Sequence, residues 1–311
     1  NCSGLGYWTV KVLTPGVHTQ QFNFSDQIAY AYNTVASDVC DQGDADTLCV
    51  VNTIHGVHNN SVLYFHNLTI QNGGALRNQT TSTDPNAIIT FNISANNIII
   101  ESGGRIEGNV FINASNLTVL TGGLINVTGT GYAGGWSSTA GNGPGGAQAR
   151  TLSSVAGSGA GYGGIGGNGG SDTGKAGSSY GSITAPTNLG SGGGGGDVAG
   201  GNGGGVIFLN ITDTLNATGN LIAIGGNGAD ATGSDAAGGG SGGSIYIIAY
   251  NLTGSGDINA TGGKGGDGGS TALGGGGGGG RIAVYYTAKE FTGTIQAFGG
   301  AAGGAGGGAG S

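Results

Sequence analysis

Glycine is the feature that most restricts what this chain can fold into, because 77 of its 311 residues have no side chain. An interior Gly costs a helix about 1 kcal/mol relative to Ala, so an α-rich fold is excluded. Collagen is excluded too, because the glycines form blocks such as residues 192–196 with no three-residue register. Large aliphatic residues are scarce, so the chain either has a narrow apolar core or is disordered.

The charge and hydropathy of the chain exclude two further classes. Eight basic residues face 16 acidic ones, for a net charge of −8, so no basic surface is available for nucleic acid. No apolar run approaches the length of a membrane helix, so we expect no membrane span. The chain contains no Met and begins at Asn1, and we expect it to be a processed segment.

Acceptor motifs for N-glycosylation are unusually frequent. Thirteen Asn-x-Ser/Thr sequons are present, nearly three times the number expected from random placement. This excess predicts a secreted, extracellular protein that carries covalent N-glycans. The candidate sites are Asn1, Asn23, Asn59, Asn67, Asn78, Asn92, Asn113, Asn116, Asn126, Asn210, Asn216, Asn251 and Asn259. We expect Asn67, Asn116 and Asn251 to be occupied, because each begins a repeat unit.

The three cysteines fit an oxidising compartment. Cys40 and Cys49 close a short acidic loop, and we predict a disulfide between them. Cys2 is then unpaired or bonded to another chain. The alternative is three free thiols in a reducing compartment.

A short internal repeat predicts the architecture. Residues 67–76 (NLTIQNGGAL), 97–106 (NIIIESGGRI) and 116–125 (NLTVLTGGLI) share Asn, alternating apolar positions and a Gly pair. Alternation predicts a strand with one inward face, and the Gly pair predicts a sharp bend.

The pattern returns, in a looser form, at residues 215, 252 and 291, and strands such as 206–210 and 244–250 follow Gly blocks. Stacked parallel strands of this kind would form an all-β parallel β-helix, or solenoid, with ladders of Ile, Leu and Val.

The segments GAGYGGIGG at 159–167 and SGGSIYIIAYNLTGSGDINATGGKG at 241–265 resemble the glycine-rich repeats of large cell-surface proteins in plants and protists. Those repeats are similar to the pectin-lyase-like parallel β-helix class. The resemblance implies a β-solenoid over residues 63–311, with long ordered Gly-rich loops and an insert at 129–204. Residues 1–62 fall outside it, and we expect a β-rich N-terminal cap or small domain there.

Pectin-lyase-like folds include polysaccharide lyases and hydrolases, which use neighbouring acidic residues or a basic Arg or Lys. The solenoid region offers separate aspartates with no Asp-Asp pair, and Arg281 lacks a following Lys that would complete a lyase-like segment. We therefore expect no enzymatic activity. These aspartates are Asp213, Asp230, Asp235, Asp257 and Asp267.

Two patterns are candidates for metal binding. Asp230 and Asp267 each end a GGxGxD motif of the kind that opens a Ca²⁺-binding nonapeptide, but the motif's apolar position holds Thr232 and Gly269. Solvated turn aspartates are the alternative, and we expect no obligatory cofactor. Three of the four histidines, His55, His58 and His66, have metal-like spacing, although surface or structural roles fit them better.

Aromatic side chains could stack on sugars, and the candidates are Trp8, Trp136 and the eleven tyrosines. The alternative is that these side chains cover loops or fill gaps in the fold. No sequon lies in 127–209, so this Gly-rich stretch can pack closely against other backbone or a second subunit.

These features predict a structural subunit of an extracellular fibril, surface appendage or wall-like coat. The alternatives are an adhesin or glycan-binding module and, third, a polysaccharide lyase or hydrolase. The tail after Phe298 has no charge or bulky side chain, so we expect head-to-tail self-assembly of C-terminal coil onto the N-terminal region, with Cys2 available as a lock.

Overall fold

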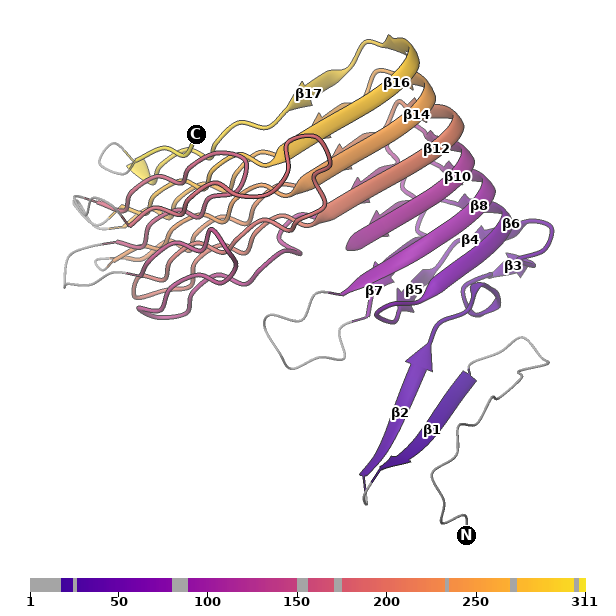
Figure 1. The fold of residues 1–311 in the computed structure, drawn as a ribbon, viewed down its shortest axis with the longest axis horizontal. Coiled ribbons are helices and arrows are strands. Elements are labelled where there is room, and N and C mark those ends of the chain that lie inside the picture. Colours follow the sequence, from indigo (N-terminus) through magenta and orange to yellow (C-terminus); the bar gives the residue numbers. More distant parts are fainter. Residues whose placement is uncertain are drawn as a thin grey trace.

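The computed structural model describes residues 18–24, 27–79, 89–149, 156–170, 175–232, 235–268, 273–304 and 308–311, with side chains from residue 33 onward. The fold is all-β and contains two sheets that are rich in parallel pairs (Figure 1). The larger sheet contains β3 (Gln42–Gly43), β4 (Cys49–Val51), β6 (Val62–Ile70), β8 (Thr90–Ile100), β10 (Asn109–Val119), β12 (Val206–Ala217), β14 (Ser244–Gly254) and β16 (Arg281–Phe291). The smaller sheet contains β5 (Ile54–Val57), β7 (Ala75–Asn78), β9 (Arg105–Glu107), β11 (Leu124–Asn126), β13 (Asn220–Ile222), β15 (Asp257–Asn259) and β17 (Thr294–Gln296).

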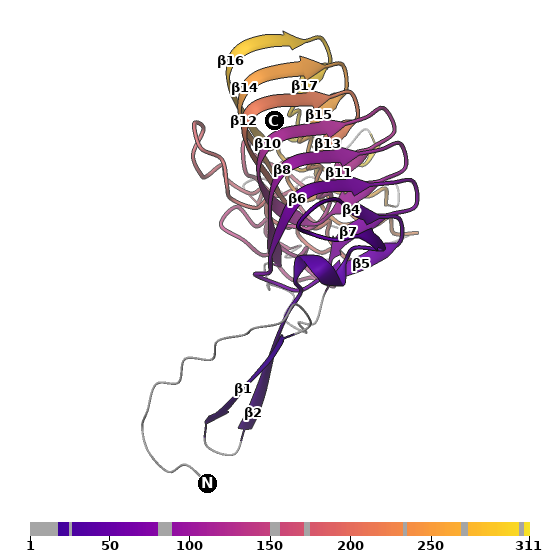
Figure 2. The same ribbon diagram turned by 90° about the vertical axis from the view of Figure 1, so that its right-hand side faces the viewer.

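The chain alternates between the two sheets. From β4 onward, each strand of the large sheet is followed by one of the small sheet, and we call such a pair a tier. Each tier pairs in parallel with the next, so the strands stack in chain order from β4 to β16 and from β5 to β17 (Figure 2). Only β3 pairs antiparallel within these sheets, against β4.

Both glycines of the repeated pair are needed where the chain turns from the large sheet to the small one. Gly73 and Gly103 have φ of +86° and +81°, which side chains with a Cβ rarely adopt. The next glycine, Gly74 or Gly104, lies so close to the tier before it that a Cβ would overlap the carbonyl oxygen of Val51 or Ile70, respectively. The repeat is therefore a turn that only Gly-Gly can make.

The core is a set of narrow columns between the sheets. On the large sheet one column aligns Leu63, Ile93, Ile112, Leu209 and Ile247, all fully buried. The small sheet contributes a second column of fully buried residues, which are Leu76, Ile106, Ile125, Leu221 and Ile258. Each strand contributes one aliphatic side chain to each column, and these side chains fill the space between the sheets. A small number of large apolar residues is therefore enough to form the core.

The Gly-rich segments outside the strands form a block of extended backbone, to the left of the sheets in Figure 1. In its central segment, residues 238–243, every backbone N–H donates to the carbonyl oxygen of another segment. Three neighbouring segments accept in turn, so every third residue donates to the same segment. The acceptors are Gly194 and Ser191 for residues 238 and 241, Gly275 and Gly278 for 239 and 242, and Gly226 and Ala223 for 240 and 243. Three residues per turn with no internal hydrogen bond is the periodicity of a polyproline II helix.

This central segment is surrounded on all sides. Its carbonyl groups accept from three further segments, through the N–H groups of Ala160, Gly201 and Gly263 among others. A Cβ on Gly238 or Gly242 would overlap the carbonyl oxygen of Ser158 or Ala260. The described parts of the predicted insert thus pack by direct backbone hydrogen bonding, and glycine is the residue that allows such close approach.

The N-terminal region precedes the tiers. It contains the antiparallel hairpin of β1 (His18–Phe24) and β2 (Gln27–Asn33) and the short 3₁₀ helix η1 (Ala36–Asp38). Strands β3 to β5, in residues 42–57, already pair with the two sheets, ahead of the expected boundary at residue 62. Among the described residues, no helix has the length and hydropathy needed to cross a membrane.

Candidate functional site

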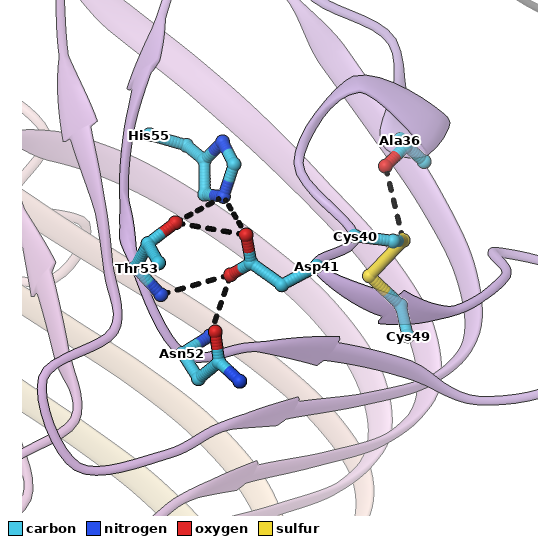
Figure 3. Close-up of polar contacts among 7 residues, drawn as sticks. All are labelled: Ala36, Cys40, Asp41, Cys49, Asn52, Thr53 and His55. Atoms are coloured by element: carbon cyan, nitrogen blue, oxygen red, sulfur yellow. Dashed lines mark hydrogen bonds and ion pairs between the residues drawn. A yellow bond between two sulfur atoms is a disulfide. The ribbon is translucent and has the colours of Figure 1, made fainter.

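A dense polar cluster surrounds Asp41, at the N-terminal end of the tiers (Figure 3). One carboxylate oxygen accepts from the backbone N–H groups of Asn52 and Thr53 at 2.7 and 2.8 Å. The other lies 2.8 Å from Thr53 Oγ1 and 3.0 Å from His55 Nε2. Asp41 thus holds the turn between β4 and β5, whose free amides point toward it.

These contacts determine the protonation of Asp41. Burial of the carboxylate, whose side chain is 18% exposed, opposes ionisation. The hydrogen bonds from Asn52, Thr53 and His55 outweigh that effect and lower the pKa of Asp41 to about 2. The group is therefore an anion at any physiological pH.

The Asp-His-Thr combination does not have the geometry of a nucleophilic triad. A triad uses both imidazole nitrogens, one toward the carboxylate and the other toward the hydroxyl. Here Nε2 of His55 faces both Asp41 and Thr53 Oγ1, the latter at 3.1 Å. The cluster is a clamp, and His55 closes the small-sheet core column beneath Leu76.

The predicted disulfide between Cys40 and Cys49 is confirmed, next to this clamp (Figure 3). Cys49 is fully buried and lies in register with Leu68, so it closes a core column of the large sheet. Cys40 Sγ lies 3.2 Å from the carbonyl oxygen of Ala36 in η1. Disulfide and clamp together cover the N-terminal end of the core; Cys2 lies outside the described residues.

The histidines have separate partners. His58 Nδ1 is 2.9 Å from Thr34 Oγ1, and His66 Nδ1 is 3.0 Å from Asn96 Nδ2. Within the described ranges, no group of three or more His, Cys, Asp or Glu side chains could hold a metal ion.

Asp230 and Asp267, the Ca²⁺ candidates, do lie on adjacent layers, where Asp230 Oδ1 accepts from the Asp267 N–H at 2.7 Å. Lys264 Nζ lies 2.6 Å from Asp267 Oδ2, and both aspartates raise the pKa of Lys264. The ammonium group of Lys264 thus places a positive charge beside the two carboxylates.

The remaining aspartates form other contacts. Asp257 accepts from Thr294 Oγ1 and Asp213 from Thr214 Oγ1, while Asp197 accepts from the Asp235 N–H. A depression of about 480 Å³ is lined by Gly56, Arg77, Asn78 and Gln79.

An asparagine ladder on the outer face of the large sheet includes sequon sites. Asn67, Asn97 and Asn116 are in register on β6, β8 and β10, joined by Asn97 Nδ2–Asn67 Oδ1 (2.7 Å) and Asn116 Nδ2–Asn97 Oδ1 (3.0 Å). Thr214 and Asn251 continue the column on β12 and β14. The three sites expected to be occupied therefore lie on alternate tiers of one column, separated by residues that are not acceptors.

The other sequons differ in accessibility. Asn59 and Asn113 are exposed, whereas Asn259 is only 8% exposed and accepts from Thr261. Asn78 donates to Ile89 O at 2.6 Å, and its Oδ1 is buried without a partner in the described structure. Asn92, Asn126, Asn210 and Asn216 are half-buried, Asn1 lies outside the described residues, and nothing is described of the Asn23 side chain.

The structure also assembles aromatic residues that sequence spacing did not reveal. Phe111, Phe208, Tyr246 and Tyr285 form a continuous row on the outer face of the large sheet, with ring centroids 5.2 to 5.9 Å apart. They come from four strands: Phe111, Phe208 and Tyr246 are register neighbours, and Tyr285 lies two residues beyond Ala283, the register partner of Tyr246. Trp136 is 73% exposed and lies in the Gly-rich block, and Trp8 lies outside the described residues.

Comparison with protein-family models, with curated proteins and with solved structures found no match.

Proposed function

We propose that the chain is a structural subunit of a secreted, N-glycosylated extracellular fibril, surface appendage or wall-like coat, built as a parallel β-solenoid. The alternation of strands between two parallel-rich sheets supports the solenoid, since each tier equals one turn. The outward-facing sequons on the large sheet support a glycan coat.

The observation that carries the assembly proposal is the last tier of the small sheet. Ile295 on β17 ends the column of Ile258, Leu221 and their fully buried equivalents, but is itself 44% exposed. Phe298, which follows, is 69% exposed. The equivalent apolar residues of Leu76 to Ile258 are fully buried, and in the proposed assembly a second subunit buries Ile295 in the same way.

The adjacent backbone supports the same contact. Gly300 and Gly303 donate to Gly277 and Gly274 of the layer below. Ala301 and Ala302 between them donate to no other described residue, whereas all N–H groups of residues 238–243 are bonded. In the proposed assembly these two amides, which have no acceptor among the described residues, donate to a second copy of the chain. A head-to-tail contact of this kind, repeated without closure, gives a filament.

The test is a point substitution at this end. Ile295→Lys places an inward charge on β17, and we expect it to abolish filaments seen by negative-stain microscopy and light scattering. Ile183→Lys is the matched control, because Ile183 is 73% exposed on a different part of the surface. Filaments of the Ile295→Lys protein, or an intact protein that stays monomeric at high concentration, would contradict the proposal. Deleting residues 290–311 is less sharp, because it uncovers β15 and Ile258, which repeat the same features.

A glycan-binding module is the second candidate, favoured by the aromatic row on the outer face of the large sheet. An enzyme is the third candidate, and the clamp geometry at Asp41 gives it no support.

A further inference from the structure

The aromatic row lies among potential glycosylation sites. Phe111 and Phe208 are direct register neighbours on β10 and β12, and Phe208 is followed by Tyr246 on β14. All three rings are half-buried, with one side toward solvent. The row is a strip of apolar rings on the outside of the large sheet.

Three sequon asparagines border this strip. Asn113 and Asn210 follow Phe111 and Phe208 by two residues, so they point to the same side of the sheet. Asn92 on β8 is the direct register partner of Phe111. A glycan attached at any of these amides starts within one side-chain length of an aromatic ring.

We propose that the N-glycan carried by Asn113 or Asn210 folds back onto this row, with its first sugars stacked on Phe111, Phe208 and Tyr246. The inference rests on the N-glycosylation in the proposed function and names the surface that the glycan covers. The C–H groups on one face of a pyranose ring are weakly positive, and the face of an aromatic ring is negative, so the two stack favourably.

The centroid spacing of the row matches the units of a linear oligosaccharide, and neighbouring rings are tilted by 45° and 60° to each other. The rings are 5.7 Å apart from Phe111 to Phe208 and 5.2 Å apart from Phe208 to Tyr246, comparable to the length of one pyranose unit. At the far end, Tyr285 Oη donates to Thr184 O at 2.9 Å, so the segment containing Thr184 borders the strip there. The core of a single glycan would cover the rings between these limits.

An attached glycan is favoured over a free saccharide as the occupant. The covalent link holds the sugar at a high effective concentration above the rings, so even a weak stacking interaction is populated. A strip intended for a foreign glycan would be obstructed by three acceptor sites along its border.

The experiment uses the full chain from a eukaryotic secretory host with ¹³C-labelled glycans trimmed to the first N-acetylglucosamine. Glycopeptide mapping first shows which of Asn92, Asn113 and Asn210 are modified. We expect the N-acetyl methyl resonance at Asn113 or Asn210 to be shifted upfield by the ring currents. Phe208→Leu, which keeps an apolar side chain but removes the ring, should abolish that shift.

Tyr250→Leu is the matched control, because Tyr250 is 55% exposed on β14 but outside the row, and it should leave the shift unchanged. Unmodified Asn113 and Asn210 would overturn this inference, and unmodified sequons throughout would overturn the glycosylation in the proposed function as well. Modified asparagines with an unshifted methyl resonance would overturn this inference alone. Binding of free chitotriose to Tyr246 in the glycosylated protein would also overturn it, in favour of an external ligand.

Discussion

Lys289 occupies, on the last strand of the large sheet, the register position that Leu252 holds one tier earlier. Leu252 is fully buried, whereas Lys289 is exposed. In the same way, exposed Tyr286 on β16 occupies the register position that buried Ala249 holds on β14. Two inward positions of the last strand of the large sheet therefore hold polar side chains, a known protection against edge-to-edge association, while Ile282 and Val284 occupy two others. The small sheet has no equivalent, since Ile295 ends its column.

Replacing Lys289 by Leu should increase self-association. The substitution extends the apolar column of Leu252 to the end of the molecule, so more apolar surface is gained when two subunits meet. We expect a higher apparent mass by light scattering at equal concentration. Lys175→Leu, in the Gly-rich block, is the control for loss of a positive charge alone. An unchanged mass for Lys289→Leu would mean that this end takes no part in association.

Asp41→Asn should destabilise the protein at pH 7 and remove part of its acid sensitivity. Because the folded-state pKa of Asp41 is lowered to about 2 from an ordinary 3.8, its stabilisation is complete above pH 4 and is lost as the pH falls through 2. The expected loss in the free energy of unfolding at pH 7 is about 1 to 2 kcal/mol, allowing for partial solvent screening. Urea unfolding at pH 7 and between pH 4 and 2 measures it. Asp46→Asn, on the same loop and exposed, should behave like wild type.

Removing the disulfide should weaken the same end of the molecule. Replacing Cys40 and Cys49 by Ser removes a cross-link between residues nine positions apart in the sequence. Chain entropy predicts a loss of about 2 to 3 kcal/mol in the free energy of unfolding. Thermal unfolding with and without reductant gives the value, and reductant should have no effect on the double variant. Peptide mapping that finds both thiols alkylatable without reduction would contradict the pairing.

Substitutions in the Gly-rich block should depend on how closely the backbones approach. Gly238→Ala places a methyl group onto the carbonyl oxygen of Ser158, and we expect a cost of about 3 kcal/mol or more in unfolding free energy. Gly226→Ala is the matched comparison, because its new Cβ would meet no atom closer than 3.0 Å. Equal melting temperatures for the two variants would contradict the close packing.

Asn113 and Asn210 should not both carry a glycan in one molecule. They are direct register neighbours on adjacent strands, about 4.8 Å apart, and Asn210 Nδ2 donates to Asn113 Oδ1 at 3.1 Å. Asn113→Gln should therefore raise occupancy at Asn210, as measured by quantitative glycopeptide mapping. The same substitution should leave Asn251, in a different column, unaffected. Full occupancy of both sites in wild type would show that no exclusion operates.

The repeat pattern predicted much of the fold because its residues act locally. The Asn residues at 67, 97 and 116 begin equivalent half-strands in perfect register, and the Gly pairs mark the turns. The disulfide was also predictable, because the two cysteines are close in sequence.

Features that depend on register between distant strands were not predictable. The aromatic row joins Phe111 to Phe208 across 97 residues, with the Gly-rich insert between them. The sequence expectation for this end considered only the tail after Phe298, whereas the register shows that Tyr286 and Lys289 of β16 also lie on the last tier. The Asp41 clamp was missed because its partners are mainly backbone amides, which a sequence pattern does not distinguish.

The three-residue period of the hydrogen bonds around residues 238–243 has a consequence for how such a block can change in evolution. Each residue points to a new neighbour, rotated by about 120° from the one before. An insertion or deletion of one or two residues redirects every later donor in that segment toward the wrong neighbour, while a change of three restores the pattern one turn further on. Length variants of these segments should therefore be tolerated only in steps of three residues.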